Sequence, residues 1–268
     1  FGHDHLLFLS DFQVGPGDLR AFRLISIEAG LLEQLPAPKI PFGLDLSGAI
    51  VADGDLQGLG RFENLRMLDL SRGRTFSELE GYRLRGLLTD AGLTELSKLK
   101  NLQVLDLGGT DVTNSTLKRL SGLKNLRWLN LAGTQVSKRG LKELDGLTNL
   151  RWLNLGYTDG THIGLMGLAG LKNLQSLADT YVRPAHLNEL TCLESLQYFS
   201  GRLGDQPQVA SRLKNLKMLT DPGPIELSKL ENLQVLTFGR TVTPAELQGV
   251  VGLKNLESLN LSLASVGD

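Results

Sequence analysis

The sequence predicts an α/β solenoid, a right-handed horseshoe with a parallel β-sheet on its concave face and short helices or 3₁₀ turns on its convex face. Three observations predict this fold. Leucines recur in a fixed frame, the frame returns every 24 residues through the centre of the chain, and each repeat contains a strand pattern followed by a short helix pattern.

The repeat is clearest between Leu102 and Leu177. The frame L-x-x-L-x-L begins at Leu102, Leu126 and Leu150, and it starts again at Leu174, so that every step is 24 residues. In such an array each unit contacts only its neighbours, and the leucines of successive units form one continuous core.

A single unit shows how the two faces arise. In residues 126–131 we expect Leu129 to face the core while Trp128 and Asn130 point outward, because successive side chains of a strand alternate. In residues 137–144, Leu141 and Leu144 are spaced three apart between charged residues, which predicts the inner face of a short helix. Helices are wider than strands, so the stack should bend.

We expect two parts, residues 1–39 as an N-terminal cap with one degenerate repeat and residues 40–268 as the repeat array. In the first part, Phe22 and Ile25 fit the first and fourth frame positions, and Leu31, Leu32 and Leu35 should face inward. A cap is required because an open solenoid end exposes its leucine core to water.

Two irregularities interrupt the array. The step from Leu65 to Leu102 is 37 residues, which places an insertion loop at residues 71–87, after the carboxyl end of a strand. The step from Leu216 to Leu233 is only 17 residues and contains Asp-Pro-Gly-Pro at 221–224, which predicts an extended or 3₁₀ path on the convex side.

Composition excludes several functional classes. The chain has 28 Lys and Arg against 29 Asp and Glu, so its net charge of −1 favours neither nucleic acid nor an anionic membrane surface. Cys192 is the only cysteine, which excludes an intrachain disulfide and, with no signal-peptide pattern, favours a cytoplasmic location; we expect it in the core. No apolar run has membrane-spanning length. No catalytic, phosphate-binding or metal-ligand motif occurs, so we expect no enzyme, no cofactor and no metal site, and a monomer.

The unit, with threonine after L-x-x-L-x-L-x-x, resembles the leucine-rich repeat family over residues 41–266. Thr110, Thr134 and Thr158 stand where that family commonly has asparagine. The resemblance implies that these threonines form a ladder to backbone groups of neighbouring turns. This 24-residue variant is similar to repeats of planctomycete and other bacterial proteins, and trypanosomatid surface proteins carry a similar one. The family is defined by its scaffold, so the resemblance does not identify the partner.

The outward strand positions form the candidate binding surface for a protein or peptide. Trp128 and Trp152 are neighbours on adjacent strands, and binding hot spots are enriched in Trp, Tyr and Arg. The other candidates on this face are Arg127, Arg151, Asn130, Asn154, Met67, Arg66 and Tyr198. A second candidate contact is the insertion loop, with Arg72, Arg74, Arg83 and Arg85.

These patterns leave two interpretations open. The chain is a non-catalytic interaction scaffold that binds a protein or peptide on its concave face, or it is a structural or spacer module of a larger protein, such as a secreted effector or surface protein, whose activity lies outside this chain. The start without methionine and the finish in mid-repeat favour the second interpretation. The alternative for the tryptophans is that they stabilise the sheet by stacking on each other.

Overall fold

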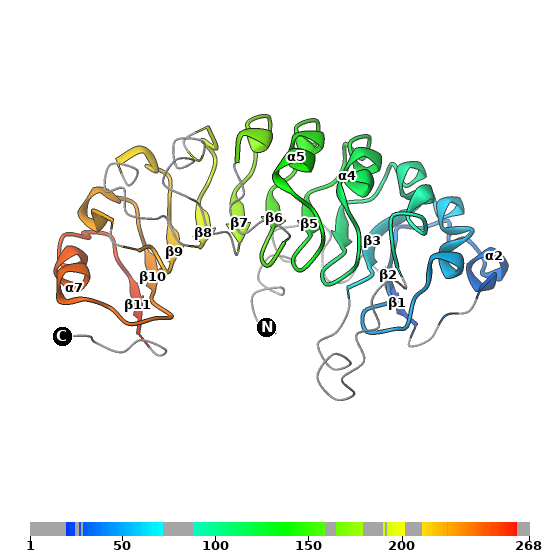
Figure 1. Cartoon of the computed structure of the whole chain (residues 1–268), viewed down its shortest axis with the longest axis horizontal. Helices are drawn as coiled ribbons and strands as arrows, with labels where there is room; N and C mark the ends of the chain where they lie inside the picture. Colours follow the sequence, from blue (N-terminus) through cyan, green and yellow to red (C-terminus); the bar gives the residue numbers. More distant parts are fainter. Residues whose placement is uncertain are drawn as a thin grey trace.

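The protein folds into an arch with its strands along the inner side and its helices and 3₁₀ turns along the outer side (Figure 1). The computed structural model describes residues 20–24, 27, 29–71, 88–158, 165–178, 190, 192–201, 211–223 and 225–261. Eleven parallel strands form one sheet in the order of the sequence, β1 to β11. The predicted fold class, a solenoid with the sheet on the concave face, is confirmed.

The strands are short, as expected for a repeat of this length. They are β1 (Arg20–Arg23), β2 (Phe42–Asp45), β3 (Leu65–Asp69), β4 (Val104–Asp106), β5 (Trp128–Asn130), β6 (Trp152–Asn154), β7 (Ser176–Ala178), β8 (Tyr198–Ser200), β9 (Met218–Thr220), β10 (Val235–Thr237) and β11 (Ser258–Asn260). The described helices on the outer side are α2 (Leu31–Gln34), η1 (Asp53–Leu56), η2 (Leu59–Arg61), η3 (Thr94–Lys98), α4 (Asn114–Leu120), α5 (Lys138–Leu141), η4 (Lys142–Leu144), η5 (Leu165–Leu168), η8 (Leu227–Lys229) and α7 (Pro244–Val250).

The first and fourth frame positions both face the core, although strict alternation would place them on opposite faces of a strand. The structure reconciles the two with a backbone carbonyl shared between two N–H groups. The carbonyl of Gln103 accepts hydrogen bonds from Arg127 N–H at 2.8 Å and Trp128 N–H at 3.0 Å. The carbonyl of Arg127 does the same for Arg151 and Trp152, and the pattern continues to the carbonyl of residue 234. One extra residue per strand, as in a β-bulge, turns both the second and third positions outward.

The core is one continuous cluster built mainly of leucines, which stack in columns from turn to turn. Leu129, Leu153 and Leu177 occupy the fourth frame position of successive turns, and each has no exposed surface. Complete burial of one such side chain contributes about 2 kcal/mol, so the column is the main stabilising element of the array. Aromatic side chains enter the core both in the early turns, with Phe42 and Phe62, and in the later turns, with Phe199 and Phe238.

Asparagines connect successive turns just before each strand. The Asn149 Nδ2 atom donates to the Lys124 carbonyl oxygen of the preceding turn at 2.9 Å, and Asn173 donates to the Thr148 carbonyl in the same way. The other rungs of this asparagine ladder are Asn64, Asn101, Asn125, Asn215, Asn232 and Asn255.

The threonine ladder implied by the family resemblance is wrong. The hydroxyls of Thr110, Thr134 and Thr158 donate to the carbonyl three residues earlier, at 2.6, 2.6 and 2.9 Å. A hydroxyl on Cβ is short and reaches its own turn, so the three threonines close turns individually. The longer carboxamides of the asparagine ladder make the bonds between turns.

On the outer side, a polar side chain of one turn caps the next turn. Asp90 accepts hydrogen bonds from the N–H and hydroxyl groups of both Thr113 and Thr116 at the start of α4. Burial alone would raise the pKa of Asp90, but these hydrogen bonds outweigh it and lower the pKa below its ordinary value of 3.8. Asn114 of α4 then accepts from the Ser137 N–H at 2.9 Å, immediately before α5.

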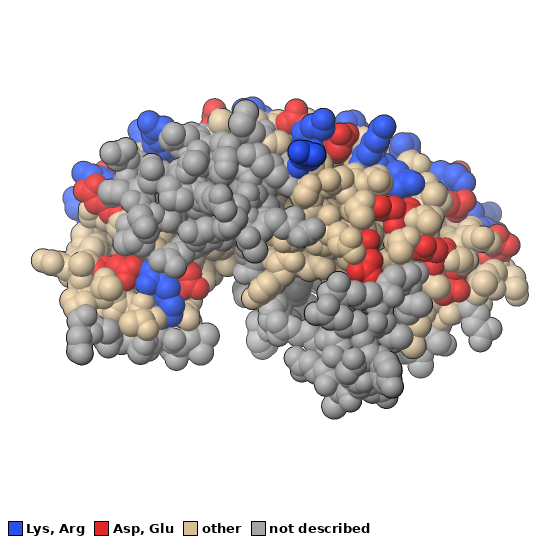
Figure 2. Space-filling model, viewed as in Figure 1, with Lys and Arg blue, Asp and Glu red and all other residues tan. Residues whose placement is uncertain are grey.

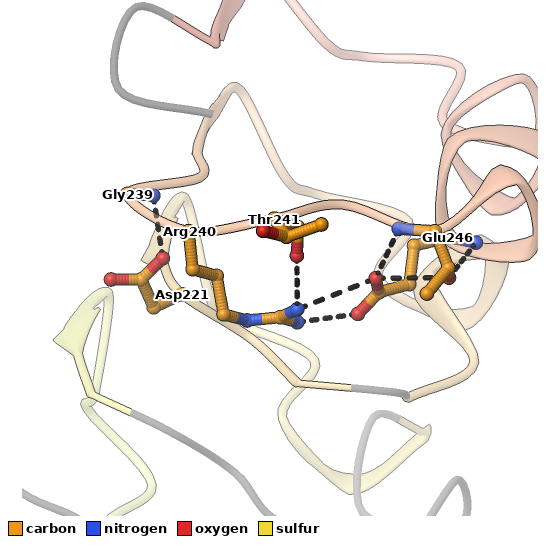
Figure 3. Close-up of polar contacts among 6 residues, drawn as sticks. Asp221, Gly239, Arg240, Thr241 and Glu246 are labelled. Carbon is orange, nitrogen blue, oxygen red and sulfur yellow. Dashed lines mark hydrogen bonds and ion pairs between the residues drawn. The ribbon is translucent and has the colours of Figure 1, made fainter. Parts of the chain in front are cut away.

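Helix α7 has a complete capping box of its own (Figure 3). The Thr243 N–H donates to Glu246 Oε2 at 2.9 Å, while the Thr243 hydroxyl accepts from the Glu246 N–H at 3.3 Å. Arg240 pairs with the same carboxylate. Burial would raise the pKa of Glu246, but its bonds to Arg240 and Thr243 lower it overall.

The register corrects the predicted frame of the first repeat. Phe22 of β1 pairs with Leu44 of β2, which in turn pairs with Leu68, so Phe22 occupies the fourth frame position and not the first. Leu24 accordingly stands at the sixth position, where its N–H donates to the Asp45 carbonyl at 2.9 Å. The predicted inward direction of Leu32 is confirmed, because it is fully buried.

Other local predictions have mixed outcomes. The helix predicted within residues 137–144 is present as α5 followed by η4, and the short step near residue 221 contains the 3₁₀ turn η8. Cys192 is exposed, so its predicted place in the core is wrong. Leu190 and Leu193 take the buried positions of that turn and leave Cys192 facing outward.

The asparagine ladder is tested by making the same Asn→Asp change at two positions, with a different stability effect expected at each. Asn149→Asp replaces a donor with a second acceptor against the Lys124 carbonyl, and we expect the free energy of unfolding to fall by about 1–2 kcal/mol. The matched control is Asn154→Asp, because Asn154 uses Oδ1 as an acceptor from Gly156 N–H. Chemical denaturation at neutral pH should show little change for the control, and equal losses for both would contradict the assignment.

Candidate functional site on the concave face

The outward positions of the frame form three parallel rows on the concave face. The central row is the third frame position, and the register aligns it from strand to strand. From β3 to β10 its members are Met67, Val104, Trp128, Trp152, Ser176, Tyr198, Met218 and Val235. Met67, Tyr198, Met218 and Val235 are partly exposed. A mostly apolar strip therefore crosses the strands along the inner side of the arch.

Trp128 and Trp152 stack face to face in this row. Their ring centroids lie 4.2 Å apart and the ring planes differ by 3°. Val104 and Ala178 pack against the pair, and the four side chains form a cluster separate from the leucine core. Stacked aromatic pairs on adjacent strands stabilise a sheet by up to about 1 kcal/mol beyond area burial.

The pair is buried, which corrects the predicted exposed aromatic patch. Trp128 is 6% exposed and Trp152 9% exposed. Stacking removes one face of each ring from water, and the packing of Val104 and Ala178 contributes to the rest. The predicted adjacency of the tryptophans is therefore correct, while little of either ring is available to a partner.

The second frame position forms a row of side chains that all carry N–H donors, here called the donor row. Its members are Arg66, Gln103, Arg127, Arg151, Gln175, Gln197, Lys217 and Gln234. Arg151 and Lys217 are exposed, and the others are partly exposed. The Arg66 Nη1 atom donates to the Asn101 carbonyl at 3.0 Å, which holds this arginine against the next turn.

The fifth frame position is engaged in holding the backbone. Asn130 Oδ1 accepts from the Ala132 N–H at 3.0 Å, and Asn154 Oδ1 accepts from the Gly156 N–H at 2.9 Å. These bonds close the turn at the carboxyl end of each strand, as an Asx turn does. The two asparagines lie on the predicted face, and their carboxamide oxygens have a structural role there.

In the first turns the fifth position is acidic. Asp45, Asp69 and Asp106 are aligned on β2, β3 and β4. Burial raises the pKa of Asp106 to about 7, and the neighbouring charge of Asp69 adds to the effect, while bonds from Gly108 N–H and Asn130 oppose it. Figure 2 shows acidic side chains gathered over the limb of the arch that contains β1 to β3, with basic side chains along the outer rim.

An open depression of about 570 Å³ lies at the later end of the donor row. It is lined by Gln197, Asn215, Lys217, Asn232, Gln234, Lys254, Asn255, Leu256 and Glu257. The three asparagines belong to the ladder, so their Nδ2 groups are already engaged with backbone carbonyls. The depression is shallow and polar, and it suits a partner's surface better than an enclosed small molecule.

Tyr157 is a residue that the sequence analysis missed. It is 85% exposed and has a left-handed φ of 53°. The same frame position is Gly109 and Gly133 in the two preceding turns, at φ 73° and 68°. In the sequence, the tyrosine at a position that is glycine in the two preceding turns is the feature that indicates a strained, exposed side chain. Backbone strain of this kind costs about 1 kcal/mol or more and often accompanies function.

The predicted insertion-loop arginines Arg72, Arg74, Arg83 and Arg85 lie outside the described residues. Within the described ranges, no group of three or more His, Cys, Asp or Glu side chains could hold a metal ion. No helix in those ranges has both the length and the apolar composition needed to cross a membrane.

The periodic leucines and the continuous parallel sheet define a solenoid of the leucine-rich-repeat class. Solved structures with a similar fold include internalin C2 (inlC2) of Listeria monocytogenes, with 26% sequence identity and a TM-score of 0.46 over 73% of this chain and 70% of that chain. Another is the internalin inlF of the same species, with 18% identity and a TM-score of 0.41 over 89% of this chain and 88% of that chain. No family model matches the sequence, and no curated protein matches it.

Asp106 predicts a specific pH dependence of stability. The unfolded carboxyl ionises near 3.8 and the folded one near 7, so the folded state holds an extra proton between these values and stability falls as pH rises through this range. Asp106→Asn should remove this fall and stabilise the protein by up to about 4 kcal/mol above pH 7. The free energy of unfolding of both proteins is measured by denaturation from pH 4 to 8. Parallel pH dependences of the two proteins would contradict the raised pKa.

Relief of backbone strain at Tyr157 is also measurable. Tyr157→Gly should raise the free energy of unfolding by about 0.5–1 kcal/mol, because glycine adopts a left-handed φ without steric cost. Tyr157→Ala removes the same ring and keeps the strained Cβ, so it serves as the control and should give no gain. A stability loss in the glycine variant would mean that the tyrosine ring makes a compensating contact.

Proposed function

We propose that this chain is a non-catalytic protein-interaction scaffold whose concave face binds a protein or peptide. The observation that carries the proposal is the central row, a mostly apolar strip that follows the inner side of the arch from β3 to β10. Side chains on neighbouring strands lie about 4.8 Å apart, so the row presents a continuous contact surface to one elongated partner.

The contact itself is assigned to the partly exposed members of the row. Tyr198, Met218 and Val235 are adjacent on β8, β9 and β10 and each keeps part of its surface in water. Trp128 and Trp152 act as a rigid floor beside them, because their stacking fixes both rings. Tyrosine and methionine are enriched at binding interfaces, and their burial by a partner would supply affinity.

The alternative function is a structural or spacer module, and the burial of the tryptophan pair is the observation that favours it. Replacing both tryptophans with alanine would not separate the two functions. Truncation of a buried aromatic side chain costs about 3–5 kcal/mol of stability, so a lost interaction could simply reflect unfolding. A discriminating test must therefore change side chains that are partly exposed.

The double variant Tyr198→Ser with Met218→Ser meets this requirement. We expect its circular dichroism spectrum to match that of the wild type and its affinity for a captured partner to fall about 30-fold or more, the effect of losing a hot-spot contact. Partners are captured with the wild-type protein, identified by mass spectrometry, and their affinities for both proteins are measured.

The matched control removes apolar surface away from the concave face. Ile50→Ser with Val251→Ser changes side chains that are 56% and 87% exposed, so it tests non-specific hydrophobic capture. The control should bind as the wild type does. Equal binding by the folded Tyr198→Ser, Met218→Ser variant would instead favour the spacer function.

A further inference from the structure

The donor row has a uniform chemistry over eight successive turns. Every member is Arg, Gln or Lys, four members carry a positive charge, and none is acidic. From Arg127 to Gln234, the shared-carbonyl pattern places each member immediately beside a member of the central row. The concave face therefore presents a strip of N–H donors parallel to a mostly apolar strip.

None of the described residues forms an ion pair with a cation of this row. Among the described residues, Arg127, Arg151 and Lys217 have no ion-pair partner. By contrast, Asp45 on the opposite side of the face is paired with Arg23 at 3.7 Å. Three unpaired cations along one line attract anionic groups, and water-exposed cations lose little when such a group arrives.

At its later end the donor row enters the open depression. Gln197, Lys217 and Gln234 belong to both, and Lys254 adds a further cation there. Glu257, at the same frame position in the last described turn, ends the run of donors and accepts a hydrogen bond from Gln234 Nε2 at 3.0 Å. The run of donor side chains therefore stops at an acidic residue at the β11 end of the concave face.

We propose that the occupant of the concave face is an extended acidic segment of a partner protein, with its carboxylates on the donor row and its apolar side chains on the central row. This inference rests on the proposed function and specifies its partner. Eight turns at about 4.8 Å span roughly 34 Å, the length of about ten extended residues at about 3.3 Å each.

The two neighbouring strips decide between partner classes. The donor row and the central row consist of consecutive residues, so the two rows lie about 3.8 Å apart. An extended chain can direct alternate side chains to two rows this close, whereas a helix about 10 Å wide cannot. A nucleic acid or a sulfated glycan would satisfy the cations, but it would leave the aliphatic and thioether side chains of the central row uncovered. Half of the donor row is neutral glutamine, which suits backbone carbonyls of a peptide as well as its carboxylates.

Selection from a random peptide library, with members about twelve residues long, tests the proposal on the folded protein. Selected peptides should be enriched in Asp and Glu alternating with apolar residues relative to the unselected library. The chain has only two tryptophans, so the fluorescence of Trp128 and Trp152 reports binding at the centre of this face. Affinity should fall at about 300 mM salt, where exposed charges are screened.

The variant Arg127→Gln, Arg151→Gln, Lys217→Gln removes the three unpaired cations. Glutamine already occupies this frame position in four turns, so the variant should fold normally. We expect the selected acidic peptides to bind about tenfold more weakly, the effect of losing three partly exposed ion pairs. The matched control, Lys118→Gln, Arg139→Gln, Lys142→Gln, removes three exposed charges from α4, α5 and η4 on the outer side and should bind unchanged.

Several results would overturn the proposal. They are an absence of acidic enrichment, failure to select any peptide, unchanged affinity in the donor-row variant, or tighter binding of single-stranded DNA or heparin than of the acidic peptides. If peptides are selected whose binding depends on Tyr198 and Met218 and not on the donor row, the proposed function stands while the acidic partner is rejected.

Discussion

The backbone carbonyl shared between two N–H groups at the start of strands β5 to β11 is the constraint on which the rest of the array depends. Without the extra residue that it accommodates, the leucines at the first and fourth frame positions could not both reach the core. Because the same feature recurs in register through the array, the core is continuous and the strands remain parallel neighbours. The curvature of the arch follows, since the outer side carries helices and 3₁₀ turns that are wider than the stacked strands (Figure 1).

The same constraint also determines the chemistry of the concave face. It turns two consecutive residues outward in every turn, and these become the donor row and the central row. The fifth frame position is different because its side chains close the turns through bonds such as that from Gly156 N–H to Asn154. In β5 and β6 the fifth position thus has a structural role, as does the tryptophan pair of the central row, whereas the second position makes no such regular bond.

The sequence predicts the fold well because the fold depends on short-range, repeated information. The leucine frame, the helix after Ser137 and the 3₁₀ turn in the short step near Asp221 each follow from spacing within one or two turns. Frame position alone predicts the wrong residues for the ladder, because it does not measure how far a side chain reaches. Thr134 has a hydroxyl that bonds within its turn, whereas the Asn149 carboxamide is long enough to reach the turn before it.

The candidate site is less predictable because exposure depends on packing between turns. The register of Trp128 and Trp152 could be predicted from the repeat, but the parallel stacking that buries them depends on rotamers and on Val104 and Ala178 at their sides. The sequence pattern predicts Phe22 at the first frame position, whereas it occupies the fourth. Its segment contains apolar residues at two competing spacings, and only the pairing with Leu44 distinguishes them.

The distribution of polar bonds separates stabilising residues from those available for recognition. The asparagine ladder, Asp90 and Glu246 satisfy backbone donors or acceptors and rigidify the arch. Arg127, Arg151 and Lys217 have no ion-pair partner within the described part of the chain. A rigid surface loses little conformational entropy on binding, so even exposed ion pairs of modest individual strength can add to affinity when a partner contacts several together. In the proposed complex, the regular backbone would let these individually weak contacts act together in selecting the partner.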